Sequence, residues 1–369
     1  MQPRVLVGSH YNDGMTLYNA SVFEFCRIIA ETSEADVAAP QELANGPFRV
    51  LTSALSKGRR AIGRTGLPLL TSMEVSEDYD LFFYVCMQPR NLNGLDTIRN
   101  WRKRARKAAV FILEAWSSQL ANEKAYLEIL DTFDHVFLFN QASIPNVQAY
   151  TSTTCSFLPA GADCLTAMPD PIDAPRPIDV YSMGRRSEAA HRQLFEMAYK
   201  SEIFYVYDIG GGLRVNDFEQ ARFLTLNYIK RSRFFIAHRH AVGTKAREAA
   251  GEEAIPSRMF EGAAGGAVMI GSAPRCSEFE QLFCWSDAVI EIPAEPNDMR
   301  SVLAELDKHP ERLRKASLQN VTQSLRLHDW IYRWEHVLGT FRLEIPQGVR
   351  ARQARLETLA ASAERRFQS

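Results

Sequence analysis

Short apolar runs alternate with helical stretches along almost the whole chain, and this alternation constrains the fold more than any other feature. In the first half the runs are 4–8, 80–87, 108–114, 135–140 and 155–159, and in the second half they are 178–183, 203–208, 233–237, 267–270 and 288–292. Continuous apolar strands that alternate with helices are typical of parallel sheets covered on both faces. The sequence therefore predicts an α/β fold with doubly wound parallel sheets.

A cluster of prolines divides these runs into two sets. Prolines stand at positions 169, 171, 175 and 177, and such a density suits neither a helix nor a central strand. We therefore expect an N-terminal domain over 1–168, a stiff linker over 169–177 and a second domain over 178–330. Helical patterns follow at 297–308, 310–327 and 329–341. We expect the segment 331–369 to pack back on the N-terminal domain.

Composition narrows the class of protein. The 369 residues carry a formal net charge of −1, so no global field favours nucleic acid. The six cysteines are scattered without metal-site spacing, and no apolar run reaches the roughly 18 residues of a membrane span. We expect a cytoplasmic protein. The basic cluster 99–107 is interpreted as a solvated helix face or as a peripheral contact with anionic lipid.

The stretch 253–271 holds two glutamates, Glu253 and Glu261, with Arg258 between them. Pro256 and Ser257 favour a helix start, and the Gly-Gly pair that follows favours its end. This pattern predicts a loop, a short helix with Arg258 and Glu261 in its first turn, and a buried strand. A helix start suits phosphate groups, with Arg258 on phosphate oxygens and Glu261 on a vicinal diol such as ribose. Alternatively, Glu261 only complements the helix dipole and pairs with Arg258 at the surface.

Other candidate ligand-binding residues lie where predicted strands end. In parallel sheets ligands bind beyond these carboxyl ends, and two such domains leave a cleft between them. Gly14 follows the first strand, and the pair Gly184–Arg185 follows the first strand of the second domain. Arginine is well suited to hold a diphosphate. Cations at 238–240 and Lys245 follow a third strand and line the same rim if this topology holds.

Some apparent motifs are discounted. Asp78-Tyr-Asp80 spells a DxD metal motif, but it precedes a strand and lies at the wrong end for the expected cleft. The glycines at 210–212 lack a phosphate-loop frame and are interpreted as a turn. No Ser-His-Asp or G-x-S-x-G pattern supports hydrolytic chemistry.

With these residues in hand, the second half of the chain resembles group 1 glycosyltransferases of the GT-B fold, of the branch with spore-coat-maturation-type enzymes. The segments that carry the resemblance are 158–163, 179–185, 253–271, 286–291 and 328–333. The stretch from Glu253 is the most specific. The resemblance implies two Rossmann-like domains that face across a cleft.

The family implies roles for single residues. Arg185 would stabilise the diphosphate of a nucleotide-sugar donor, Glu253 would bind the transferred sugar, and Glu261 the ribose hydroxyls. The Gly14 loop would approach from the first domain. Other expected donor-binding residues are Gly184, Lys245, Arg258 and Met259. The family also implies retention of anomeric configuration, no metal and no other cofactor, with a glycan, lipid-linked or small hydroxylated acceptor.

The chain departs from the family pattern in two places. No lysine occurs between Arg186 and Tyr199, where the family carries one, and Arg192, Lys245 or Arg258 are possible substitutes. The usual Gly-Phe-Gly after the first glutamate is also absent. Two alternatives to a transferase therefore stay open, a nucleotide-sugar 2-epimerase and a non-catalytic protein that binds a nucleotide or glycan.

Overall fold

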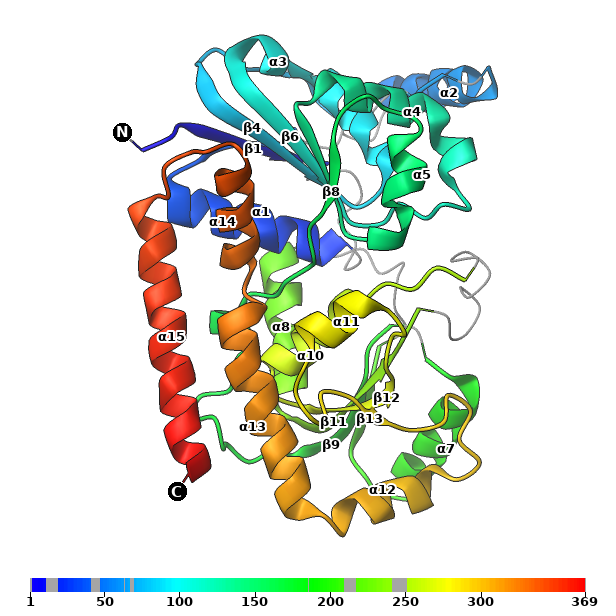
Figure 1. Ribbon diagram of the computed structural model, residues 1–369. Helices are drawn as coiled ribbons and strands as arrows, with labels where there is room; N and C mark the ends of the chain where they lie inside the picture. Colours follow the sequence, from blue (N-terminus) through cyan, green and yellow to red (C-terminus); the bar gives the residue numbers. More distant parts are fainter. Residues whose placement is uncertain are drawn as a thin grey trace. The chain divides into compact units, whose positions relative to one another are not determined.

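The computed structural model describes residues 2–10, 19–40, 47–62, 64–66, 70–184, 186–208, 217–240 and 251–368. These residues form two compact α/β units, drawn in Figure 1. The first unit contains the described parts of Met1–Met15 and Asn19–Pro159, together with Arg333–Ala351. The second contains the described parts of Ala160–Tyr332 and of Arg352–Ser369.

The first unit is built on a parallel six-stranded sheet in the order β2-β1-β4-β6-β7-β8. Its strands are β1 (Val5–Ser9), β2 (Asp36–Ala38), β4 (Tyr79–Cys86), β6 (Ala105–Ile112), β7 (His135–Leu138) and β8 (Cys155–Phe157). A second, two-stranded sheet pairs β3 (Met73–Glu74) with β5 (Ile98–Arg99). The central strands β1 and β4 are buried almost throughout, as expected for a sheet covered on both faces.

Helices and short helical turns connect these strands. They are α1 (Ala20–Ser33), α2 (Pro47–Ala61), α3 (Trp101–Arg104), α4 (Lys124–Leu127) and α5 (Ile144–Gln148), with 3₁₀ turns η2 (Pro89–Thr97), η3 (Leu120–Glu123), η4 (Glu128–Thr132) and η5 (Gln141–Ser143). Part of the C-terminal chain also packs in this unit. Trp334 of α14 (Trp330–Thr340) is fully buried against Phe83, and its indole Nε1 donates to Ser33 Oγ at 2.7 Å.

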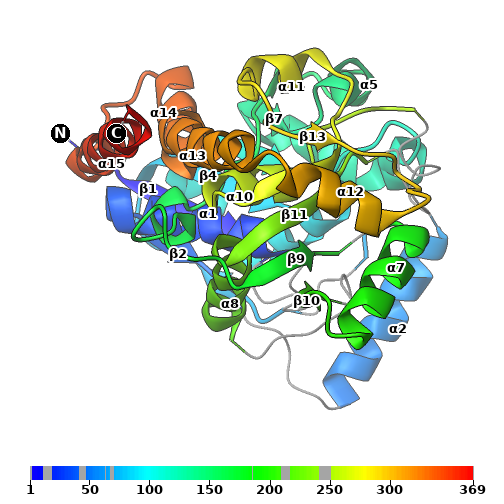
Figure 2. The ribbon, with the colours of Figure 1, turned by 90° about the horizontal axis from the view of Figure 1, so that it is seen from below.

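The second unit contains a parallel five-stranded sheet in the order β10-β9-β11-β12-β13. The strands are β9 (Ile178–Ser182), β10 (Tyr205–Tyr207), β11 (Ser232–His238), β12 (Val268–Ser272) and β13 (Ile290–Glu291). One face packs against α7 (Glu188–Tyr199) and α12 (Met299–Asp307), and the other against α8 (Phe218–Lys230) and α10 (Ser257–Ala264), as Figure 2 shows. The remaining helices are α6 (Cys164–Ala167), α11 (Ser277–Leu282), α13 (Pro310–Leu327) and α15 (Gln347–Gln368).

Local chemistry explains where several of these helices begin. Ser187, Asp217 and Asp298 each accept a hydrogen bond from a backbone N–H in the first turn of the helix that follows. Such caps satisfy amide groups that a helix start leaves unpaired. Pro310 occupies the first position of α13, where a missing N–H costs nothing.

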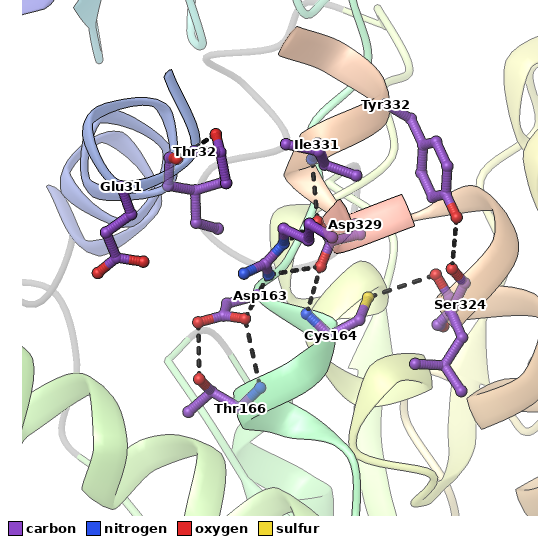
Figure 3. Close-up of polar contacts among 12 residues, drawn as sticks. Glu31, Thr32, Asp163, Cys164, Thr166, Ser324, Asp329, Ile331 and Tyr332 are labelled. Atoms are coloured by element: carbon purple, nitrogen blue, oxygen red, sulfur yellow. Dashed lines mark hydrogen bonds and ion pairs between the residues drawn. The ribbon is translucent and has the colours of Figure 1, made fainter. Parts of the chain in front are cut away.

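A buried charge cluster joins three distant segments of the second unit (Figure 3). Arg352 Nη2 donates to Asp163 Oδ1 at 2.6 Å and to Asp329 Oδ2 at 2.7 Å, and its Nε donates to Asp329 Oδ1 at 2.9 Å. Asp329 also accepts from the backbone N–H groups of Cys164 and Ile331. All four oxygens of the two buried carboxylates accept hydrogen bonds, which offsets much of the cost of burying them, and the burial that is not offset raises the pKa of Asp329.

All ten apolar runs predicted to be strands are strands in the structure, with ends that differ by up to about three residues. The sequence analysis missed β2, β3 and β5, which have two or three residues each. Residues 160–168, assigned above to the first domain, pack in the second unit. The C-terminal segment is shared, since 333–351 belong to the first unit and 352–368 to the second.

Candidate functional site

The carboxyl ends of β9, β10 and β11 bring polar side chains together in the second unit. Gly184 follows β9 with a φ of +68°, and its N–H donates to Asp208 Oδ1 at 2.8 Å. Asp208 follows the neighbouring strand β10 and also accepts from Tyr181 Oη at 3.3 Å. A positive φ is readily adopted by glycine, so Gly184 permits this tight turn between adjacent strand ends.

Arg258 reaches the same turn from the start of α10. Its Nη1 donates to the carbonyl oxygen of Met183 at 3.0 Å, and a Cβ on Gly184 would lie 3.6 Å from its Nη2. The structure therefore brings Gly184 and Arg258 close together. Met259, the next residue, is fully buried, and its N–H donates to the carbonyl of Pro256 at 2.9 Å. In this structure the Met259 side chain belongs to the core of the unit.

His238 lies at the end of β11, close enough to Arg258 for their charges to interact. Burial, and to a smaller extent the nearby Arg258 guanidinium, lower the pKa of His238 to about 4. The imidazole is therefore neutral at pH 7. Its Nδ1 lies 3.3 Å from Ser272 Oγ at the end of β12. Its buried Nε2 has no hydrogen-bond partner among the described residues.

Glu253 lies on the loop before α10 and pairs with Arg239, which follows β11. Arg239 Nη1 donates to Glu253 Oε1 at 2.6 Å, and the glutamate side chain is 14% exposed. Glu253 Oε2 is buried and makes no hydrogen bond within the described part of the chain. One carboxylate oxygen is thus held by Arg239, and the other is left without a partner by the described residues.

Glu261 also has one paired and one unpaired carboxylate oxygen, and it is more deeply buried than Glu253. Arg222 Nη1 of α8 donates to Glu261 Oε1 at 2.7 Å, and the two side chains are only 7% and 4% exposed. Glu261 Oε2 is buried without a hydrogen bond from any residue that the structure describes. The predicted place of Glu261 in the first helical turn is wrong. Helix α10 begins at Ser257, so its first turn ends at Phe260 and contains no acidic residue.

This geometry also contradicts the alternative interpretation, in which Glu261 complements the helix dipole and pairs with Arg258 at the surface. A residue in the second turn lies beyond the free amide groups at the helix start, where the dipole acts most strongly. Its observed ion pair is with Arg222, while Arg258 turns to the backbone of Met183. The pairing of Arg222 and Glu261 links α8 to α10 across the same face of the sheet.

Arg186 is a further polar residue at this edge of the sheet and lies next to β10. Its guanidinium donates to the carbonyl oxygen of Asp208 and lies 5.2 Å from the centroid of the Tyr207 ring. Its Nη1 is buried and, as far as the structure describes the chain, has no partner. This makes Arg186 part of the site, although the sequence analysis selected its neighbour.

Four buried polar atoms without partners therefore belong to residues at or beside one edge of one sheet: Arg186 Nη1, His238 Nε2, Glu253 Oε2 and Glu261 Oε2. An unsatisfied buried polar group costs about 1–3 kcal/mol, and more when it is charged. Native proteins therefore rarely keep several together unless a ligand or water completes them. The edge has the composition of a site for a polar, anionic and hydroxylated ligand.

Three of the predicted site residues, Gly14, Arg185 and Lys245, lie outside the described residues. Conversely, sequence reasoning missed Asp208 and Arg222. Asp208 ends an apolar run, and this position at a strand end was an available signal. No local sequence pattern pointed to Arg222, because its partner Glu261 is 39 residues away.

The carboxyl end of the first sheet carries its own titratable groups. Burial lowers the pKa of His10, directly after β1, to about 4. Burial also raises the pKa of Glu123 in η3 to about 7, and the Arg90 guanidinium offsets part of this rise. Arg90 interacts electrostatically with both residues, so the three form a second polar group at the edge where ligands of parallel sheets bind.

The discounted motifs have structural partners. Asp80 accepts from the backbone N–H of Arg4 at 3.0 Å, and Asp78 pairs with Arg104 at the entrance end of β4. Within the described residues, no three His, Cys, Asp or Glu side chains are arranged to hold a metal ion. The part of the chain that the structure describes also contains no helix with the length and apolarity to span a membrane.

Comparisons with known proteins agree with this architecture. The profile of a family described as glycosyl transferase-like matches residues 219–339, which include Arg222, Glu253, Arg258 and Glu261. Comparison with curated protein sequences finds no match. An α-glucosyltransferase solved with UDP-glucose and DNA containing an abasic site is similar in structure, with a TM-score of 0.50 and 9% identity over 92% of this chain and 99% of that one.

Two further solved structures align over similar lengths. A glycosyltransferase from Rickettsia africae has a TM-score of 0.47 and 11% identity, over 93% of this chain and 98% of that one. A trehalose-phosphate synthase from Burkholderia vietnamiensis has a TM-score of 0.47 and 9% identity, over 92% and 99%. The chain has the α/β GT-B fold, with two Rossmann-like parallel-sheet units. The family match and this fold support a GT-B glycosyltransferase.

Proposed function

We propose that the protein is a glycosyltransferase that moves a sugar from a nucleotide-sugar donor to a hydroxylated acceptor, with retention of configuration and without a metal ion. The observation that carries the proposal is the set of unpaired polar atoms on Arg186, His238, Glu253 and Glu261 at one sheet edge, beside Arg258. The family match over 219–339 covers His238, Glu253 and Glu261 of this set and Arg258.

Each part of a nucleotide-sugar has a counterpart among these groups. The diphosphate would lie against Arg258 and the turn at Gly184, because a guanidinium holds phosphate oxygens with two donors. Glu261 Oε2 would accept from the ribose hydroxyls, and Glu253 Oε2 from a hydroxyl of the transferred sugar. The neutral imidazole of His238 would donate or accept a hydrogen bond without adding charge. Arg185 and Lys245 are proposed to contact the same donor.

The proposed chemistry follows from the charge that develops as the sugar–phosphate bond breaks. Negative charge grows on the leaving diphosphate, and a fixed guanidinium stabilises this charge more than it stabilises the ground state. The acceptor oxygen then bonds to the anomeric carbon on the face that the phosphate leaves, and the leaving phosphate takes the proton of the acceptor hydroxyl. Arg258 would supply the charge stabilisation for which many phosphate-transferring sites use a metal ion. Retention is proposed from the resemblance of 253–271 to retaining enzymes.

The acceptor is proposed to bind at the carboxyl edge of the first sheet, where His10, Arg90 and Glu123 lie. The pKa of Glu123 is about 7, so near neutral pH its carboxyl group is present in both forms and can accept a hydrogen bond from an acceptor hydroxyl or donate one to it.

The test is an assay of nucleoside diphosphate release with a panel of nucleotide-sugars, with and without EDTA. We expect release that EDTA leaves unchanged and that Arg258→Met lowers about 100-fold or more. The exposed Arg355 of α15 provides the control variant Arg355→Met, which should retain full activity. Loss of activity in EDTA would contradict the metal-free scheme, and an unchanged rate in Arg258→Met would remove Arg258 from the reaction. Conversion of the donor to its 2-epimer instead of diphosphate release would replace transfer by epimerisation.

A further inference from the structure

Helix α2 of the first unit has its apolar side outward. Val50, Leu51, Leu55 and the adjoining Ile62 are 70%, 56%, 51% and 70% exposed, whereas Ser56 is buried at 6%. Thr52 and Ser53, close to Ser56 on the helix surface, are half-buried. A helix at the surface of a globular protein normally buries its apolar stripe and exposes its polar one. Helix α2, at the margin of the first unit in Figures 1 and 2, does the reverse.

The exposed residues form one continuous arc around the helix axis. At about 100° per residue, Val50, Ala54, Gly58, Leu51, Ile62 and Leu55 fall within roughly 140° of one another. Each of them is exposed, and together they form a smooth apolar strip along the helix. Gly58 lies in the middle of this strip and has no heavy atom within 4 Å of its Cβ position.

This strip is the main exposed apolar surface of the first unit. Among the described residues of that unit, the one other exposed large apolar side chain is Val37, at 42%. Contiguous apolar surface of this kind marks an interaction site more often than scattered single residues do.

The charges of the helix itself are all positive, and one carboxylate from another segment, Asp96, lies close enough to Arg59 for their charges to interact. The stretch 43–73 contains five arginines and lysines, at 49, 57, 59, 60 and 64, and no acidic residue. Lys57 and Arg59 lie at the two edges of the apolar arc, since they are about 340° and 180° around the axis from Val50. The Lys57 side chain is exposed, and Arg59 also donates from Nε to the carbonyl of Thr65 at 3.1 Å.

We propose that α2 binds the surface of a membrane that contains anionic lipid, with its axis in the plane of the interface. The apolar strip would enter the boundary between headgroups and acyl chains, while Lys57 and Arg59 at its edges would meet the phosphate groups. An apolar face bordered by cations is the pattern of helices that lie on membranes. The binding is weak and reversible, because one short helix inserts few side chains.

Two features of the strip favour lipid over a second copy of the chain. A stable protein interface buries about 800 Å² on each partner, far more than four aliphatic side chains on one helix provide. Energetically important protein contacts are also rich in Trp and Tyr, and the described side chains of the strip include neither. A lipid surface needs no complementary shape, so a short smooth strip is sufficient.

The basic cluster 99–107 is a weaker candidate for the same role. Arg102 and Lys107 pair with Asp134, and Arg104 pairs with Asp78. These two carboxylates pair with three of the six arginines and lysines of the cluster. The cluster also lacks an exposed large apolar side chain within the described part of the chain, so it has nothing to insert into lipid.

The experiment is co-sedimentation of the full-length protein with large vesicles of phosphatidylcholine, either alone or mixed with phosphatidylglycerol. We expect binding that requires phosphatidylglycerol and falls more than about tenfold in the double variant Leu51→Gln, Leu55→Gln. Lys57→Gln should weaken binding about fivefold, the effect of one cation at an anionic surface. All substituted side chains are exposed, and circular dichroism checks that the variants fold.

Two matched controls test whether the effect is specific to α2. Leu224→Gln changes an equally exposed leucine of the second unit, 53% exposed, and Lys103→Gln changes an exposed lysine of the basic cluster. Both should bind like the wild type. Equal binding of the wild type and the double variant would overturn the proposal, as would equal binding to neutral and anionic vesicles. A wild-type dimer in sedimentation equilibrium that the double variant loses would assign the strip to a second copy instead.

Discussion

At the scale of single residues, the pair of Arg222 and Glu261 is more deeply buried than the pair of Arg239 and Glu253 at the same site. Breaking a buried ion pair by removing one partner leaves the other charge buried and uncompensated. We therefore expect Arg222→Met to lower the free energy of unfolding by about 3–5 kcal/mol, measured by urea denaturation. Arg312→Met breaks a more exposed pair with Asp287 and should cost less than about 1 kcal/mol. Equal costs in the two variants would show that Arg222 does not neutralise Glu261.

The low pKa of His238 predicts a pH-dependent stability. Its pKa is about 4 in the folded protein and about 6.5 in an unfolded chain. Between these values the unfolded chain binds more protons, so the free energy of unfolding falls as the pH drops from about 6.5 towards 4. At pH 5 the expected loss from this residue is about 2 kcal/mol relative to pH 7.

The variant His238→Gln isolates this contribution. It removes the titrating group and leaves the other histidines, including His10, in place. The difference in unfolding free energy between pH 7 and pH 5 should therefore be smaller in the variant by about 2 kcal/mol. If wild type and variant lose the same stability, His238 is not a buried neutral histidine.

The sequence selected several residues that the structure places at this sheet edge, but it did not predict their ion-pair partners. Glu253, Arg258 and Gly184 could be selected because their positions at strand ends and helix starts follow from local patterns. The ion pairs Arg239–Glu253 and Arg222–Glu261 join segments 14 and 39 residues apart. The first pair joins two residues outside the helices and the second joins helices α8 and α10, and a periodicity argument contains no information on either tertiary contact.

At the scale of elements, α10 and β12 are packed tightly enough to predict the effect of one methyl group. A Cβ on Gly262 would lie 2.7 Å from Phe235 Cδ1 and 2.9 Å from Met269 Sδ. Gly262→Ala should therefore destabilise the protein by about 1–3 kcal/mol through overpacking. Gly339 lies in α14, and a Cβ there meets nothing within 4 Å. Gly339→Ala should stabilise by up to about 1 kcal/mol. Thermal unfolding of both variants measures the contrast, and equal shifts would contradict it.

Most elements could be predicted because each long strand is a continuous apolar run and several helices start at a capping residue. The strands β2, β3 and β5 escaped prediction, because two or three residues carry no period. Helix α10 begins at Ser257, as the sequence predicted, but Glu261 lies in its second turn and not in the first. Helix α2 was missed as a surface feature, because a sequence pattern shows an amphipathic helix without showing which face is buried.

At the scale of the whole molecule, the fold class followed from the alternation of strands and helices, and the structure confirms two parallel-sheet units. The units are not continuous in sequence, since Arg333–Ala351 belong to the first and Ala160–Tyr332 to the second. The proline cluster at 169–177 predicted a linker between two domains from composition alone. It carried no information on the return of the C-terminal chain, which depends on buried contacts such as those of Trp334 and Arg352.

The central claim is that the carboxyl edge of the second sheet binds a nucleotide-sugar through Arg258. The most direct test is the melting temperature of the protein with UDP-, GDP-, ADP-, dTDP- and CMP-sugars, since a bound ligand at about 100 times its Kd stabilises by about 2.7 kcal/mol. We predict that one nucleotide raises the melting temperature of the wild type and of Arg355→Met, and that most of this rise is lost in Arg258→Met. No rise with any nucleotide, or an undiminished rise in Arg258→Met, would contradict the account.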